Sequence, residues 1–207
     1  MISEDHITEL ISSKKALFFQ LLQSDAWSHV SQTPNIVVHN HPPSESASKL
    51  FKMELTVQRS GSDVYKLFCN PEFRKRMEKH ASEPTILHTF GDSYIAHYVT
   101  QIPVPFVSNR EMVLLNFFEK LSDSQFMIGG FSVDLPDFSL THSKHILAKL
   151  EIGIRYIESI SDTECRLVNV SSFDFGGSFP KKLMDMAFKK RVSAMEEVKT
   201  LLETTEV

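Results

Sequence analysis

The sequence predicts an α+β protein in which an antiparallel sheet is covered by one long helix at the C-terminal end. Three observations support this prediction. Strand-like segments follow one another from residue 85 to residue 175 with only short turns between them. Helical periodicity is confined to the two ends and to a short stretch near residues 62–80. Runs of strands joined by short connections are typical of antiparallel sheets in α+β folds.

The last helix is the most regular pattern in the chain. Pro180 suits the first turn of a helix because its φ is already set and it needs no hydrogen-bond acceptor. Apolar residues then recur at helical spacing: Leu183, Met184, Ala187, Phe188, Met195, Val198, Leu201 and Leu202. A helix over residues 180–204 is roughly 38 Å long at ~1.5 Å per residue, which is enough to lie across a sheet as a lid. Such a helix over a curved sheet can roof an apolar cavity.

The N-terminal part predicts shorter elements. Ser3 can cap a helix within residues 1–26, which Trp27 would end. A polar loop at residues 41–49 separates two strands, and residues 51–58 alternate between apolar and polar side chains. Further on, Ser62 is expected to cap a short helix. The segment that starts with Asn70, Pro71 and Glu72 favours another helix that runs to His80.

Six strands are predicted in the second half of the chain. Their ranges are Ile86–Phe90, Tyr94–Thr100, Arg110–Lys120, Gln125–Val133, Ile146–Glu158 and Thr163–Phe175. The stretch 112–118 is nearly all apolar, which predicts a strand covered on both faces. In contrast, apolar residues from Ala148 to Tyr156 alternate with polar ones, which indicates one dry and one wet face.

Composition limits the function classes. The 207 residues fit a single domain, and the net charge of −4 gives no reason to expect nucleic-acid binding. Two isolated cysteines, Cys69 and Cys165, favour reduced thiols and a cytoplasmic setting. The start of the chain lacks the pattern of a signal peptide, and no apolar run approaches the ~18 residues of a membrane span.

Two short motifs resemble the START (StAR-related lipid-transfer) domain family. The segment 103–111, Pro-Val-Pro-Phe-Val-Ser-Asn-Arg-Glu, resembles the "P-F-P-M-S-N-R-D" type segment of these domains, with Glu111 in place of the usual aspartate. The segment 174–180, Asp-Phe-Gly-Gly-Ser-Phe-Pro, resembles their "D-x-G-G-x-I-P" motif before the last helix, with Phe179 in place of an aliphatic residue. Trp27, the order of elements and the length match as well.

The resemblance implies a helix-grip (START/Bet v 1-like) fold, in which a curved antiparallel sheet wraps around the C-terminal helix and encloses a lipid tunnel. It implies a monomer that binds one lipid without cofactor or catalysis and moves it between membranes by transient contact with their surfaces. We expect Leu183, Met184, Ala187 and Phe188 to contribute to the tunnel wall. Ile102, Val104, Phe106 and Val107 form an uncharged loop that is a candidate gate and membrane contact. A filled core and a loop packed on the last helix are the alternatives.

The lipid class is the finer question. In the phosphatidylcholine transfer protein branch of the family, an arginine and an acid four residues later meet the head group, and Arg74 and Glu78 match that spacing. An arginine fork suits a phosphate, which predicts a glycerophospholipid; a surface ion pair is the alternative. Tyr98 falls near one choline-cage position of that branch, whereas Met112 stands at another. Sterol binders of the family place an acid–base pair near the positions of His97 and Asn116, so a sterol or ceramide binder or sensor stays open.

An enzyme on the same fold is the second class. Neither a Ser-His-acid signature, a phosphate loop nor a zinc spacing stands out. His39 with His41 and His142 with His145 lack further ligands at defined spacing, so we interpret them as histidines at loop edges and expect no metal site. A cavity that contained His97, Tyr98 and Arg110 could support acid–base chemistry, as in the cyclases and hydrolases that share this fold.

Overall fold

The structure is a computed structural model, and it describes residues 2–42, 49–77, 83–101, 107–135, 138–142, 144–177 and 181–206; of residues 181–185 and 187 it describes the backbone. The elements are α1 (Glu4–Leu22), β1 (Ser28–Gln32), β2 (Ile36–His41), β3 (Leu50–Val57), α2 (Gly61–Cys69), α3 (Pro71–Met77), β4 (Thr85–Phe90), β5 (Ser93–Thr100), β6 (Arg110–Lys120), β7 (Gln125–Ser132), β8 (Ile146–Leu147), β9 (Lys149–Ser161), β10 (Glu164–Asp174) and α4 (Lys181–Thr204).

All of these strands belong to one curved sheet. The order across it is β1-β2-β3-β10-β9-β7-β6-β5-β4, and neighbouring strands run antiparallel. The short strand β8 lies off this path and pairs in parallel with the start of β6. The predicted antiparallel α+β fold is therefore confirmed.

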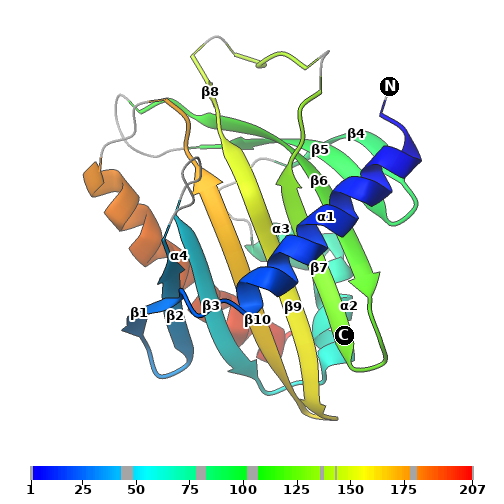
Figure 1. Cartoon of the computed structure of the whole chain (residues 1–207), viewed down its shortest axis with the longest axis vertical. Coiled ribbons are helices and arrows are strands. Elements are labelled where there is room, and N and C mark those ends of the chain that lie inside the picture. The colour runs from blue at the N-terminus through cyan, green and yellow to red at the C-terminus, as the bar shows by residue number, and fades with distance from the viewer. Residues whose placement is uncertain are drawn as a thin grey trace.

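Helices cover both faces of the sheet (Figure 1). On one side α1 crosses β9 and β7 diagonally, and its buried residues Ile7, Phe18 and Leu21 pack with inward-facing residues of the strands such as Ile154 and Val170. On the other side lie α2, α3 and α4. We call these two sides the α1 face and the α4 face. Strand β6 is buried on both, as predicted for residues 112–118.

The C-terminal helix confirms its prediction closely. It runs from Lys181 to Thr204, and its second half buries Met195, Val198 and Leu202 against β2, β3, β7 and α2. A core with 6%, 8% and 0% exposure at these three residues is filled, so this half of α4 anchors the helix to the sheet.

Several boundaries differ from the predictions for local reasons. Ser60, rather than Ser62, caps α2, because its hydroxyl oxygen accepts a hydrogen bond from the backbone N–H of Asp63 at 3.2 Å. Strand β1 was not predicted, since its five residues carry little apolar periodicity. The first helix ends at Leu22, and Trp27 follows it with its indole N–H donating to the carbonyl of Leu21 at 2.6 Å.

Strand β9 contains an irregularity that changes which residues share a face. Ser172 pairs with Ile152 whereas Phe173 pairs with Leu150, so Glu151 is an extra residue in β9. Its carbonyl accepts a hydrogen bond from Lys14 of α1 at 2.8 Å. Leu150 consequently packs on the α4 face, while Ile152, Ile154 and Tyr156 pack under α1. The predicted single dry face over residues 148–156 is wrong at this point.

Candidate functional site

A band of polar side chains and glycines crosses the α4 face. Cross-strand pairs share a face in an antiparallel sheet, so the register identifies the members of the band. Tyr94 pairs with Asn116, Asn116 with Gly130, Gly130 with Gly153, and Gly153 with Ser171. The neighbouring row contains Arg155 paired with Asn169. The strands β5, β6, β7, β9 and β10 therefore contribute to this band.

Apolar clusters lie on both sides of the band. Toward the second half of α4 the face is filled by the large cluster that includes Met53, Leu167 and Leu202. Toward the opposite end lies a smaller cluster of Ala96, Tyr98, Met112, Leu114 and Ala148, against which Tyr94, Leu150 and Phe173 pack. The α4 face thus offers polar groups between two apolar surfaces, which is an arrangement suited to an amphiphilic ligand.

Arg74 reaches the band from α3. Its Nη1 donates a hydrogen bond to the hydroxyl oxygen of Tyr94, and its guanidinium carbon lies 5.5 Å from the centre of the Tyr94 ring and 4.9 Å from that of Phe118. Its Nε is buried and has no hydrogen-bond partner among the described residues. Asn70 caps the helix that carries Arg74, accepting from the backbone N–H of Glu72 at 2.9 Å. Glu78, the other half of the predicted pair, lies outside the described residues.

Arg155 and Arg191 approach the same band from β9 and α4. Arg155 lies over the ring of Phe68, with 5.3 Å between the guanidinium carbon and the ring centre. Arg191 donates a hydrogen bond to the hydroxyl of Ser171 at 3.4 Å and lies 6.0 Å from the centre of the Phe173 ring. Burial and the nearby charge of Arg155 lower the pKa of Arg191. Sequence reasoning missed both arginines. Polar residues that alternate with apolar ones along a strand, or that recur on one side of a helix, predict a solvated side.

Tyr98, Met112 and Asn116 are brought together on the α4 face. Tyr98 pairs with Met112 across β5 and β6, and its hydroxyl donates to Oδ1 of Asn116 at 3.4 Å. The amide of Asn116 donates in turn to the carbonyl of Leu114 at 3.2 Å. These polar groups border the smaller apolar cluster. These three predicted ligand residues are therefore neighbours on the α4 face, and Asn116 belongs to the band that Arg74 reaches.

His97 does not belong to this group. Its neighbour in the register is Val113 on the α1 face, and its Nε2 lies 2.8 Å from Oε2 of Glu111. The ring also contacts Phe138 at 5.1 Å between centres. The predicted polar pair of His97 and Asn116 is wrong, because the two residues point to opposite faces of the sheet. The acid–base set of His97, Tyr98 and Arg110 is separated for the same reason.

Glu111 holds the connection between β7 and β9 against β6. Its fully buried carboxylate accepts hydrogen bonds from the backbone N–H and the hydroxyl of Thr141, at 3.0 and 2.7 Å, and contacts His97 and His145. Burial alone raises the pKa of this carboxyl group. The hydrogen bonds from Thr141, His145 and His97 outweigh burial and hold the pKa of Glu111 at about 2.

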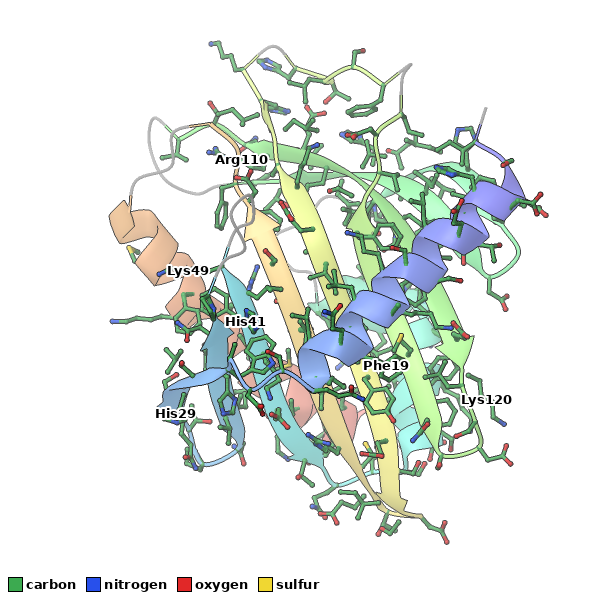
Figure 2. The ribbon with its side chains drawn as sticks, viewed as in Figure 1. Phe19, His29, His41, Lys49, Arg110 and Lys120 are labelled. Atoms are coloured by element: carbon green, nitrogen blue, oxygen red, sulfur yellow. The ribbon has the colours of Figure 1, made fainter. Side chains whose placement is uncertain are left out.

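Arg110 is buried at the same end of the sheet (Figure 2). Because it precedes Glu111 in β6, its side chain lies on the opposite face. Its Nε donates to the carbonyl of Phe175 at 2.9 Å, and its Nη1 donates to the carbonyl of Ser108. It thereby links the segment before β6 to the segment before α4, the two motifs of the family resemblance. Gly176 and Gly177 follow with φ values of +65° and +56°, a left-handed conformation that glycine adopts readily.

The rest of the predicted site is described in part. Phe188 of α4 is partly buried and packs on Phe51 of β3, with 4.6 Å between ring centres. The side chains of Leu183, Met184 and Ala187 lie outside the described part, as do Ile102, Val104 and Phe106 of the candidate gate. Val107 is partly buried.

A separate open cleft of about 100 Å³ lies on the α1 face, between β6 and the segment that follows β7. Val113, Phe138 and Ala148 are among its lining residues, and so are Asp134 and Lys149, which form an ion pair. Among the described residues, no group of three or more His, Cys, Asp and Glu side chains is placed to hold a metal ion. None of the described helices is long and apolar enough to span a membrane.

An antiparallel sheet wrapped against a C-terminal helix, with a polar band between apolar surfaces, defines a helix-grip protein. A model of the START domain family matches residues 18–206. The chain therefore belongs to the START domain family, a family of lipid-binding and lipid-transfer domains. Among curated proteins, no sequence matches this chain.

Solved structures share this fold at low sequence identity. Human StAR-related lipid transfer protein 5 is 15% identical, with a TM-score of 0.83, and the match covers 97% of this chain and 98% of that one. Human STARD10 is also 15% identical, with a TM-score of 0.74 and coverage of 90% and 78%. A STAR-related lipid transfer protein fragment from Xanthomonas axonopodis is 19% identical, with a TM-score of 0.68 and coverage of 86% and 99%. The helix-grip fold is thus confirmed.

Proposed function

We propose that this START domain binds one glycerophospholipid between the sheet and α4 and carries it between membranes without changing it chemically. The observation that carries this proposal is Arg74, a guanidinium that is packed on two aromatic rings and keeps a buried N–H without a partner among the described residues. Leaving a buried donor unpaired costs roughly 1–3 kcal/mol. A phosphate oxygen would satisfy that donor, and guanidinium–phosphate contacts are strong and geometrically specific.

Transfer needs a balance of affinities rather than tight binding. A 16-carbon chain represents about 13 kcal/mol of hydrophobic transfer at ~0.8 kcal/mol per methylene, but a bilayer supplies the same contribution. The protein must therefore match the membrane, and exchange is then nearly isoergic. The small apolar cluster, together with Phe188, Leu183, Met184 and Ala187 of α4, is the proposed wall for the acyl chains. The proposed role of Glu78 is to hold Arg74 or to meet the cationic part of a head group.

Transient membrane contact is part of the proposal. The gate would consist of Ile102, Val104, Phe106 and Val107. Met186 of α4 is 45% exposed, and its neighbours Lys189 and Lys190 are exposed as well. An exposed methionine beside lysines favours a surface that contacts anionic head groups, where each lysine contributes about 1 kcal/mol. A cytoplasmic monomer with reduced cysteines fits this role, and burial raises the pKa of the Cys165 thiol to about 12, which keeps it unreactive.

The test replaces Arg74 by glutamine and uses Arg76→Gln as the control. Arg76 lies on the same helix and is exposed. Purified proteins are incubated with vesicles of phosphatidylcholine, repurified, and analysed by lipid mass spectrometry. We expect Arg74→Gln to lower phospholipid loading about tenfold, while Arg76→Gln loads like the parent. Equal loading by Arg74→Gln would contradict the head-group role of Arg74.

A sterol or ceramide is the second candidate, and the contact between Tyr98 and Asn116 favours it. This pair borders an apolar cluster and could bind a ligand hydroxyl. The same extraction separates the two candidates by the mass of the lipid found. An enzyme is the third candidate, because the Zhui aromatase/cyclase from Streptomyces sp. R1128 shares the fold at 8% identity, with a TM-score of 0.54. A carrier leaves the mass of its bound ligand unchanged after incubation, whereas an enzyme changes that mass.

A further inference from the structure

We infer that the preferred ligand is an anionic glycerophospholipid, one whose phosphate has no cationic amine beside it, because three arginines converge on the band where the head group would lie. This inference rests on the proposed binding of a phospholipid on the α4 face. It adds two residues, Arg155 and Arg191, to the single arginine of the predicted head-group pair.

The register places Arg155 firmly on the α4 face. It lies between Ile128 of β7 and Asn169 of β10, and Ile128 belongs to the cluster covered by α2 and α4. Its guanidinium lies over Phe68 of α2, whose ring contacts Phe73 of α3 at 5.9 Å between centres. Ile128 also pairs with Phe118 of β6, and Arg74 lies over the ring of Phe118. Arg74 and Arg155 therefore occupy the same side of the sheet, two strands apart in the register.

Arg191 approaches from the opposite wall. It is a residue of α4, and its contacts with Ser171 and Phe173 hold it over β10, next to the row of Arg155. Ser171, which Arg191 contacts, pairs with Gly153 in the row next to that of Arg155 and Asn169. Burial and the charge of Arg155 lower the pKa of Arg191. Like charges in a partly buried region repel, and an anion between them removes this repulsion.

The aromatic rings of the band favour an anion over a choline group. Quaternary ammonium ions bind to the faces of aromatic rings. Here those rings already have guanidinium groups over them. Arg74 lies over Tyr94 and Phe118. Arg155 lies over Phe68, and Arg191 lies over Phe173. A choline would have to displace an arginine or lie beside one. A phosphate would instead meet guanidinium groups whose central carbons lie 4.9–6.0 Å from the ring centres. The planar fork of a guanidinium loses little freedom for each hydrogen bond that it forms.

A competition that needs no variant tests the inference first. The parent protein is incubated with vesicles of equal parts dioleoyl phosphatidate and dioleoyl phosphatidylcholine, repurified, and its bound lipid is quantified by mass spectrometry. We expect phosphatidate to exceed phosphatidylcholine about tenfold or more, since it has the same chains and lacks the choline. Equal amounts, or an excess of phosphatidylcholine, would overturn the inference while the proposed phospholipid binding stands.

Variants then locate the selectivity. We expect Arg155→Gln and Arg191→Gln each to lower the phosphatidate excess about tenfold, with total lipid per protein maintained as phosphatidylcholine takes its place. The matched control is Arg166→Gln, which changes an arginine of β10 on the α1 face that is paired with Glu54. An unchanged excess in both variants would overturn the assignment of the two arginines. If a variant fails to fold, the competition between the two lipids for the parent protein still tests the inference.

Two further results have defined meanings. Inorganic phosphate that displaces phosphatidate at equal concentration would show a site for free phosphate and overturn the inference. A parent protein that takes up neither lipid would contradict the proposed function itself, and the inference with it.

Discussion

The two faces of the sheet are built differently although the same strands form both. Under α1, side chains of Ile154, Tyr156, Val168 and Val170 form a continuous apolar layer with the helix. Under α4, the corresponding layer is interrupted by asparagines, a serine, glycines and arginines. The difference teaches that α1 covers an uninterrupted apolar layer, while the α4 face combines the filled core under the second half of α4 with polar groups that a core would not need. Buried polar groups of this kind cost stability unless they bind something.

The largest expected effect separates the two faces directly. Phe18 of α1 is fully buried, and Phe18→Ala should lower the free energy of unfolding by about 3–5 kcal/mol through lost burial and a cavity. Phe188→Ala on α4 removes a partly buried ring that packs on Phe51, and we expect about 1–2 kcal/mol. Urea unfolding monitored by circular dichroism measures both values. A larger loss from Phe188→Ala would reverse the roles assigned to the faces.

The second prediction concerns the pH dependence of the α1 face. The pKa of Glu111 falls from 4.5 to about 2 on folding, so the ionised carboxylate stabilises the folded state. This contribution is complete above pH 4.5 and is lost as the pH falls toward 2, and its size is about 3 kcal/mol. The difference in unfolding free energy between parent and Glu111→Gln should shrink over that window. A difference that stays constant with pH would contradict the proposed clamp on Thr141 and His145.

The smallest expected effect comes from two neighbouring glycines that face opposite ways. A Cβ at Gly129 would lie 2.2 Å from the Phe117 ring, whereas one at Gly130 would lie 3.2 Å from Oδ1 of Asn116. Gly129→Ala should therefore lower the free energy of unfolding by about 1–3 kcal/mol. We expect Gly130→Ala to cost less than about 1 kcal/mol, because Asn116 can shift. Similar losses at both positions would mean that the α4 face is packed as tightly as the α1 face.

Periodicity predicted the elements well and the faces poorly. The helix at residues 181–204 and the strands β5, β6 and β7 follow from their apolar patterns. The error at His97 arose because a shift of one residue in register moves every side chain to the other face, and the sequence does not state the register of β5 against β6. Likewise, the extra residue Glu151 moves the side chain of Leu150 to the other face of the sheet, and nothing in the composition of β9 indicates this irregularity.

The arginines of the band show a different limit. Arg155 alternates with apolar residues of β9, and Arg191 lies among Lys189 and Lys190, so both resemble solvated positions in the sequence. Only the contacts with Phe68 and Phe173 reveal that they face α2 and the sheet. Polar residues that alternate with apolar ones predict a strand with one solvated face. The same pattern fits a strand whose polar side chains face the interior of the protein. Asn169 and Ser171, which share a strand face with Leu167 and alternate with Val168 and Val170, were the available signal.

Arg110 gives the open end of the molecule a distinct mechanical character. Two backbone carbonyls, of Ser108 and Phe175, are joined through one guanidinium rather than through pairing of strands. Each hydrogen bond to a charged group contributes about 1.5–3 kcal/mol, far less than peeling a strand from the sheet. These bonds lie outside the pairing of the strands, so breaking them would leave the register of the ten-stranded sheet unchanged.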